Sequence, residues 1–244
     1  MQAEPLWTMT ATQAVDLLRR RDVSPADLVA AAAERIAAAL KRRLDQQKAA
    51  SLVVSGGTSP VQCFERLAHM DICWPRVGVL PSDDRWVPGE HDDSNEKLVR
   101  NNLLVNCAAS ADLLPFYTAE TSVEDRAAAL DQEIRFVPFP FACALLGMGA
   151  DGHFASLFPD AENLDEGLDL ESQTLCLPVR TEASPYPRIT LTLAALSRSD
   201  EIVLLFFGDE KRKVYEKAKA GNARYPVTRL LRQKRAPVHC YWAP

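Results

Sequence analysis

The sequence predicts an α/β fold, a doubly wound, mainly parallel twisted sheet with helices on both faces, in a single domain spanning residues 1–244. Two observations predict it. Short apolar runs rich in β-branched residues recur along the chain, and helical stretches alternate with them. Strands that alternate with helices indicate parallel pairing, because a parallel connection needs a long crossover that a helix supplies.

A helical N-terminal segment, residues 10–45, is rich in Ala, Leu and Arg and predicts two helices. Ser24 and Pro25 mark the start of the second as an N-cap followed by a proline in the first turn. This second helix, 25–44, carries an apolar stripe at a spacing of four residues, formed by Leu28, Ala32, Ile36 and Leu40. Such a stripe is typical of a helix that packs on a sheet.

Apolar runs predict strands at 51–55, 76–80, 142–146, 174–179, 189–193, 202–206 and 238–241. Helical stretches follow or precede several of them, at 60–70, 94–104, 122–136 and 211–219. The acidic stretch 159–172 contains Asn163 and Gly167 and predicts an irregular surface segment. In an open α/β sheet the ligand binds at the carboxyl ends of the strands, so the loops that follow strands are where functional residues are expected.

Composition predicts an ordinary soluble enzyme-sized domain, with 47% hydrophobic and 25% charged residues. The net charge of -5 gives no overall attraction to nucleic acid or an anionic membrane, so an anionic ligand requires a local cluster of donors. The six cysteines are scattered without metal-site spacing and predict free thiols and no metal. Residues 1–22 lack the apolar core of a signal peptide, and no run is long enough to span a membrane. We therefore expect a cytoplasmic protein, a monomer or a weak dimer.

A glycine-rich loop follows the first predicted strand and contains Ser55, Gly56, Gly57, Thr58, Ser59 and Pro60. Glycines let the backbone approach a ligand closely, and the helix N-terminus beyond them offers unpaired N–H groups to a phosphate. A purely structural alternative exists, because Ser59 as N-cap, Pro60 at the first helical position and Gln62 at the third match a capping box. The loop alone leaves both interpretations open.

Charged residues also follow the second predicted strand, where Asp83, Asp84 and Arg85 precede Trp86. Arg85 is suited to bind a phosphate or a carboxylate. The alternative is that the two neighbouring aspartates neutralise Arg85 at the strand end.

A third loop, GMGADGH, follows the predicted central strand and contains the candidate acid/base, His153. A histidine has a pKa near 6.5 when unperturbed and so exchanges protons readily at neutral pH. Asp151 lies two residues away and is placed to orient the imidazole ring or to stabilise its charged form. We interpret the three other histidines, His69, His91 and His239, as structural. Two further basic residues are candidates for additional phosphate contacts: Arg188, which opens the predicted strand RITLTL, and Lys211, which follows Gly208 after the predicted strand IVLLFF.

Taken together and in order, the segments SGGTSP, DDRWVP with the following DDSN, GMGADGHFASLFP, PRITLTLAAL and FGDEK resemble the 6-phosphogluconolactonase family, over residues 50–240. The resemblance implies a Rossmann-like fold related to glucosamine-6-phosphate deaminases. It implies hydrolysis of 6-phosphogluconolactone to 6-phosphogluconate in the pentose phosphate pathway, without a metal or cofactor. The chain departs from the family pattern at Asp84, where the family usually has a glutamate.

Carried over by position, the resemblance makes His153 the group that activates water against the lactone carbonyl and then protonates the leaving ring oxygen. Asp151 supports it. The sugar phosphate, the one partner expected, is bound by Ser55, Gly56, Gly57, Thr58, Asp83, Arg85, Asn95, Gly149, Arg188 and Lys211, with the division of labour among the basic residues left open. Water attack on an activated ester is easy chemistry, so positioning and one acid/base suffice.

Two other functions remain as alternatives. A glucosamine-6-phosphate deaminase has a similar Asp-Gly-His loop, but deaminases typically continue into a Phe-Asn-Glu-Pro run, whereas Ala155 to Pro159 follow here. A sugar-phosphate-binding regulator without catalytic activity would carry a helix-turn-helix, and residues 10–45 are too rich in Ala and too unpunctuated to make one.

Overall fold

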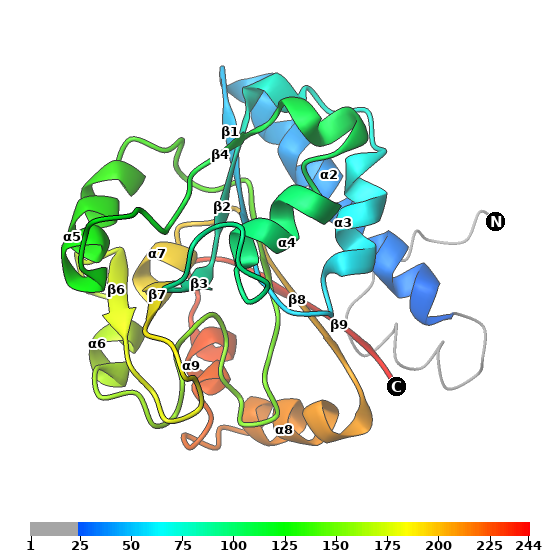
Figure 1. Ribbon diagram of the computed structural model, residues 1–244. Coiled ribbons are helices and arrows are strands. Elements are labelled where there is room, and N and C mark those ends of the chain that lie inside the picture. Colours follow the sequence, from blue (N-terminus) through cyan, green and yellow to red (C-terminus); the bar gives the residue numbers. More distant parts are fainter. Residues whose placement is uncertain (1–23) are drawn as a thin grey trace.

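The computed structural model describes residues 24–244 (Figure 1). Its centre is a parallel sheet of six strands in the order β4-β2-β1-β5-β8-β9. The strands are β1 (Ala50–Val54), β2 (Val77–Pro81), β4 (Asp112–Leu113), β5 (Cys143–Leu146), β8 (Ile202–Phe207) and β9 (Val238–Ala243). Each neighbouring pair is parallel. The predicted parallel sheet is confirmed, and its order runs outward in both directions from β1 and β5.

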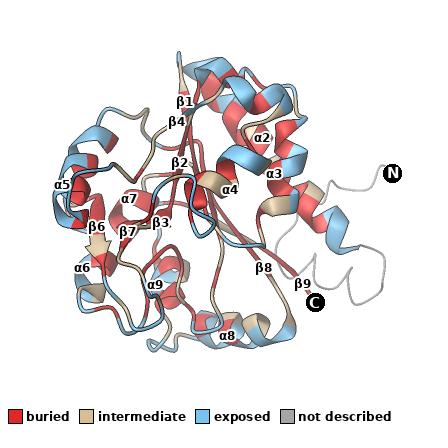
Figure 2. Cartoon of the chain, viewed as in Figure 1, coloured by how far each residue is buried: buried red, intermediate tan, exposed pale blue. Residues whose placement is uncertain are grey.

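The two faces of this sheet are covered by different helices, and the alternation of side chains in β1 shows it. Leu52 and Val54 pack in one core with α2 (Pro25–Gln46), α3 (Val61–Ala68) and α4 (Asn95–Asn102). Val53 points to the other face, into a core shared with α5 (Val123–Ile134), α7 (Leu193–Leu196) and α9 (Val227–Arg232). Figure 2 shows the helices buried where they meet the sheet and exposed on their outer sides. This doubly wound arrangement is the predicted fold class.

A second sheet of three antiparallel strands packs beside the first, in the order β3-β7-β6. It consists of β3 (Asp83–Arg85), β6 (Cys176–Val179) and β7 (Arg188–Leu191). The sequence predicted strands at the positions of β6 and β7 but not their antiparallel pairing. β3 was not predicted, because its three charged residues carry no apolar pattern. β3 is held in the sheet by its antiparallel pairing with β7, whose four residues are all buried.

The helix α2 begins as predicted, with the Ser24 side chain accepting a hydrogen bond from the Asp27 N–H and Pro25 in the first turn. The first predicted N-terminal helix lies outside the described residues. The stretch 159–172 is not irregular throughout, since it contains α6 (Leu164–Leu168). This helix packs closely: a side chain on Gly167 would come within 2.4 Å of Leu157.

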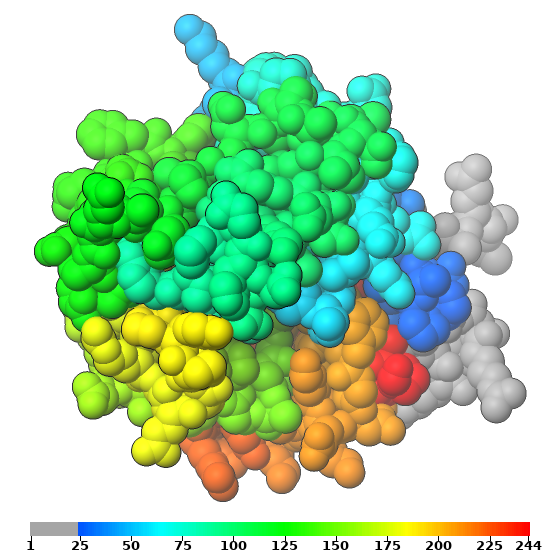
Figure 3. All heavy atoms as spheres, in the orientation of Figure 1, coloured from blue at the N-terminus to red at the C-terminus, as the bar shows by residue number. Residues whose placement is uncertain are grey.

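Two short 3-10 helices, η2 (Trp74–Arg76) and η3 (Asn106–Ser110), flank β2 and β4, and the last α-helix to be named, α8 (Asp209–Lys219), follows β8. On one face of the molecule α8 lies near segments that are distant in sequence. Figure 3 shows α8 (orange), the β6–β7 segment (yellow) and the middle of the chain (green) meeting on that face. No helix within residues 24–244 has the length and apolar character needed to cross a membrane.

Candidate active site

The candidate site lies where the strand order of the main sheet reverses, between β1 and β5. The chain runs from β1 outward to β2 and β4, then returns to β5 and runs outward to β8 and β9. A crevice opens at such a switch point beside the carboxyl ends of the strands. A cavity of ≈ 240 Å³ lies there. It brings together every residue predicted to bind substrate, together with His153; its other lining residues, which the sequence reasoning did not name as binding residues, are Ser59, Gly147, Met148 and Ala155.

The glycine-rich loop forms one wall of the cavity, and two of its glycines are required there. A side chain on Gly56 would collide with the amide of Asn95, whose Oδ1 would lie 1.8 Å from the added carbon. Gly57 adopts a left-handed conformation with φ +84° that other residues rarely adopt. The Ser55 hydroxyl lines the cavity, is buried, and has no hydrogen-bond partner within residues 24–244. A buried hydroxyl without a partner is costly, so a ligand oxygen at this wall would satisfy it.

The capping box predicted for this loop is wrong. The helix α3 begins at Val61, and Pro60 occupies the N-cap without a side-chain hydrogen bond. The physical reason is that the loop closes with its own turn, in which the Val61 N–H donates to the Thr58 carbonyl at 3.4 Å. Ser59 therefore lies before the cap and lines the cavity. The structural alternative to a ligand-binding loop loses its main support.

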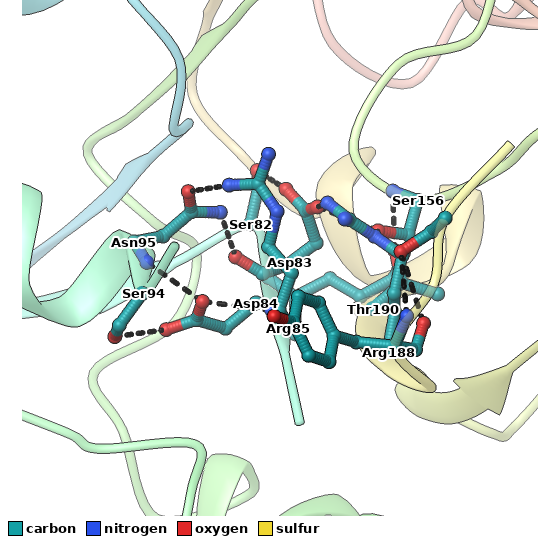
Figure 4. Close-up of polar contacts among 12 residues, drawn as sticks. Ser82, Asp83, Asp84, Arg85, Ser94, Asn95, Ser156, Arg188 and Thr190 are labelled. Atoms are coloured by element: carbon teal, nitrogen blue, oxygen red, sulfur yellow. Dashed lines mark hydrogen bonds and ion pairs between the residues drawn. The ribbon is translucent and has the colours of Figure 1, made fainter. Parts of the chain in front are cut away.

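A buried ion pair between two strands of the second sheet lines the cavity. Arg188 Nη2 donates to Asp83 Oδ2 at 2.7 Å, and both side chains are less than a tenth exposed. Ser156 donates to the same carboxylate at 2.6 Å and accepts from Arg188 Nε (Figure 4). Burial opposes ionisation of Asp83, but the Arg188 charge and the hydroxyl donors outweigh it and hold the pKa of Asp83 below its usual value. Much of the charge of Arg188 is therefore neutralised within the protein.

Asp84 has a different task, because it holds the start of α4. Its carboxylate accepts hydrogen bonds from the backbone N–H groups of Asn95 at 2.7 Å and Glu96 at 2.9 Å. Burial raises the pKa of Asp84 to about 6, against the lowering effect of these N–H donors. The Asn95 side chain then donates to the Asp83 carbonyl at 2.7 Å, which fixes its amide against Gly56. Aspartate at this position thus sets the position of a cavity-lining amide.

Arg85 is the basic residue of the second loop whose charge remains available. Its Nη1 donates to Asn95 Oδ1 at 2.8 Å. Within residues 24–244, no carboxylate forms an ion pair with it, whereas Asp83 pairs with Arg188 and Asp84 faces the α4 backbone. The alternative that neighbouring aspartates neutralise Arg85 is therefore not supported. Figure 4 shows the Asn95 amide joined by hydrogen bonds to the Arg85 guanidinium and to the Asp83 carbonyl.

The loop after β5 holds the predicted acid/base pair. His153 Nδ1 and Asp151 Oδ1 are 2.6 Å apart, and the two side chains are 29% and 42% exposed. Gly149 makes the pair possible, because a side chain there would lie 2.3 Å from the His153 ring and 2.4 Å from Asp151 Oδ1. The imidazole also packs against Phe158, with ring centroids 4.2 Å apart and ring planes tilted by 34°. Asp151, Gly149 and Phe158 together therefore restrict the position of the ring.

The charges around this pair fix which ring nitrogen carries a proton. Burial works against ionisation of Asp151, but the hydrogen bond and charge of His153 outweigh it and lower the pKa of Asp151. An ionised carboxylate only accepts hydrogen bonds, so Nδ1 of His153 must donate, and a neutral ring then has an unprotonated Nε2. Lys211, the third residue of α8, also lines the cavity. Burial lowers the pKa of Lys211, while the nearby Asp151 raises it.

The other histidines have structural surroundings. His69 caps the end of α3, His91 contacts Asp93 and the Tyr186 ring, and His239 in β9 lies near Arg35 and Glu201. Within residues 24–244, no three His, Cys, Asp or Glu side chains are grouped as metal ligands.

Comparison with known proteins identifies the family. The family model described as glucosamine-6-phosphate isomerases/6-phosphogluconolactonase matches residues 23–242. The chain belongs to this family. A 6-phosphogluconolactonase of Mesorhizobium japonicum is 41% identical over 217 residues, covering 89% of this chain and 91% of the relative. One from Pseudomonas aeruginosa is 38% identical, covering 91% and 92%. The crystal structure of a 6-phosphogluconolactonase from Shewanella baltica matches with a TM-score of 0.86 at 34% identity, covering 91% of this chain and 95% of that one.

Proposed function

We propose that this chain is a 6-phosphogluconolactonase, which hydrolyses 6-phospho-D-glucono-1,5-lactone to 6-phosphogluconate in the pentose phosphate pathway. The observation that carries the proposal is the Asp151–His153 pair, whose imidazole lines the same cavity as the glycine-rich loop and Arg85. This places an acid/base beside a cluster of donors suited to an anion. The family match and the names of the similar proteins support it.

His153 performs both proton transfers in this proposal. Its unprotonated Nε2 accepts a proton from water as the water oxygen bonds to the lactone carbonyl carbon. The resulting imidazolium, stabilised by Asp151, donates that proton to the ring oxygen as the bond between this oxygen and the carbonyl carbon breaks. The products are a carboxylic acid, which loses its proton to solvent, and a free hydroxyl. No cofactor is required, since the proton returns to the leaving group within the same site.

The phosphate binds at the glycine-rich loop. Gly57 and Thr58 let the phosphate approach the backbone, and the unpartnered Ser55 hydroxyl lines the same cavity. Arg85 supplies a positive charge that no carboxylate among the described residues neutralises, whereas the charge of Arg188 is paired with Asp83. Lys211 provides a second positive charge on the side of Asp151. This division assigns phosphate binding mainly to Arg85 and the loop.

The deaminase alternative is not favoured by the cavity. Asp83 is the single carboxylate among the described residues that line it, and Arg188 holds that carboxylate. Opening and isomerising an amino sugar requires a carboxylate free to exchange protons. Ser156, close after His153, donates to Asp83 and provides no such group.

The deciding experiment compares wild type with His153→Ala on freshly generated lactone, following acid release and subtracting spontaneous hydrolysis. We expect kcat to fall by about a hundredfold or more with substrate binding largely retained. An unchanged rate would refute the role of His153. Ammonia release from glucosamine 6-phosphate by the wild type would refute the lactonase assignment itself. Binding without turnover by the wild type would favour a regulatory module.

We also propose a cytoplasmic location and a monomeric or weakly dimeric state. The free cysteines, Cys63, Cys73, Cys107, Cys143, Cys176 and Cys240, suit a reducing compartment. Size-exclusion chromatography with light scattering measures the state directly, and a stable higher oligomer would contradict it.

A further inference from the structure

Beside the catalytic loop lies a tyrosine that does not line the substrate cavity and for which the mechanism has no use. Tyr225 belongs to the turn between α8 and α9 and packs directly on the backbone of Gly152. A side chain on Gly152 would lie 2.7 Å from the Tyr225 Cβ and 2.8 Å from its Cδ1. No atom fits between the two residues, so the tyrosine limits where Gly152 can move.

Gly152 is the residue whose conformation determines the geometry of the acid/base pair. It lies between Asp151 and His153 and has φ +81°, in the left-handed region. The two side chains that flank it meet at 2.6 Å only because the chain reverses there. Two further bonds close the loop: the Gly152 N–H donates to the Gly149 carbonyl at 3.1 Å, and the Gly149 N–H to the His153 carbonyl at 2.9 Å.

The turn that carries Tyr225 also holds the loop through the backbone. The Val227 N–H, at the start of α9, donates to the Gly152 carbonyl at 2.9 Å. The turn is itself braced, because Thr228 Oγ1 donates to the Asn222 carbonyl at 2.6 Å and the Thr228 N–H donates to the Tyr225 carbonyl at 2.9 Å. Gly152 is therefore held at two points: the Tyr225 ring packs against its α-carbon, and the Val227 N–H donates to its carbonyl.

We propose that Tyr225 is a positioning residue for the reaction: its ring holds Gly152 so that Asp151 and His153 keep their hydrogen-bonded geometry. The inference rests on the proposed lactonase function. The ring acts by contact, since its hydroxyl makes no hydrogen bond within residues 24–244. Small displacements of a catalytic group are costly, about a hundredfold in rate for 1 Å. Tyr225 does not line the substrate cavity, so in this proposal it acts through the loop.

The test compares Tyr225→Ala with Tyr225→Phe, which keeps the ring, and with Tyr215→Ala. Tyr215 is a matched control, because it is another partly buried tyrosine of this region but packs on Phe206, away from the cavity. We expect Tyr225→Ala to lower kcat by about tenfold to a hundredfold while KM stays within about twofold. Tyr225→Phe and Tyr215→Ala should retain kcat within about twofold.

The titration of Asp151 separates positioning from a general loss of structure. The hydrogen bond and charge of His153 lower the pKa of Asp151, so this pKa should rise when the two side chains move apart. We expect an NMR titration of the Asp151 carboxyl to show this rise in Tyr225→Ala and not in Tyr225→Phe. Wild-type kcat and an unchanged Asp151 pKa in Tyr225→Ala would overturn the inference, as would equal losses in the two Tyr225 variants. An inactive wild type would instead refute the proposed function.

Discussion

Adding one methyl group at Gly149 should disable the acid/base pair without removing any of its functional groups. The added carbon of Gly149→Ala would lie 2.3 Å from Nδ1 and Cε1 of His153 and 2.4 Å from Asp151 Oδ1. Nonbonded carbon contacts are comfortable at about 3.5–4.0 Å, so each side chain must retreat by about 1 Å. The 2.6 Å hydrogen bond between them cannot persist in its present place. Since a displacement of this size costs about a hundredfold in rate, we expect kcat to fall by about that factor.

The fold should tolerate this substitution. Gly149 is not among the glycines with a positive φ, so alanine is compatible with its backbone. KM should stay within about twofold, because the glycine-rich loop and Arg85 are untouched. The assay follows acid release from freshly generated lactone, with spontaneous hydrolysis subtracted, and a thermal melt accompanies it. Gly78→Ala is the control, since nothing lies within 4 Å of its added carbon.

Two outcomes would refute this reasoning. The first is a kcat of Gly149→Ala within about twofold of wild type. The second comes from combining Gly149→Ala with His153→Ala in one chain. Because the methyl group is expected to act through the imidazole, the double variant should lose little more activity than His153→Ala alone. If the increase in activation free energy of the double variant equals the sum of the increases in the two single variants, the two positions act independently.

Three further predictions follow from the charges of the site. Arg85→Ala should raise KM by about tenfold or more with little change in kcat, because a charge-assisted hydrogen bond contributes about 1.5–3 kcal/mol; steady-state kinetics check it, and an unchanged KM would exclude a phosphate contact. Arg188→Met should lower the free energy of unfolding by about 3–5 kcal/mol, since it leaves the buried Asp83 unpaired; urea denaturation measures this, and a loss below about 1 kcal/mol would show that the pair is not stabilising. The pKa of Asp83 is lower in the folded state than in the unfolded state. The ionised Asp83 therefore contributes its full stabilisation above its unfolded pKa of about 3.9, and this contribution is lost as the pH falls below that value. Between pH 7 and pH 3 the urea midpoint of Asp83→Asn should thus fall less steeply than that of the wild type, and parallel curves would contradict the linkage.

The sequence predicted five of the six strands of the main sheet, because most residues of these strands are buried; it missed the two-residue edge strand β4, which is not buried. Val53 and its neighbours in β1 are fully buried, so the run reads as continuous apolar sequence bounded by glycines. The same reasoning missed β3, where Asp83 and Asp84 occupy strand positions and are buried by ion pairing and helix capping. No local pattern reveals such burial, because the partners lie up to 105 residues away.

The members of the candidate site were easier to predict than their tasks. The glycine-rich loop, the loop with Asp151 and His153, and Lys211 all follow strands of the main sheet, and the carboxyl ends of parallel strands converge, so their proximity followed from the fold class. The difference between Arg85 and Arg188 did not. Both are arginines at strand positions, and only the three-dimensional pairing with Asp83 shows which guanidinium is already neutralised. The role of Asn95 as the link between Arg85 and Gly56 was equally invisible in the sequence.

The reversal of strand order at β1 and β5 also has a consequence for how activity is acquired during folding. The cavity is lined by segments from Ser55 to Lys211, so it forms only when parts of the chain that are far apart in sequence have come together. Contacts so distant in sequence form late, because the intervening chain must first be ordered. Lys211 reaches the cavity only after β8 has paired with β5. Recovery of turnover during refolding therefore reports the docking of the C-terminal strands, and should lag behind recovery of helical signal from α2.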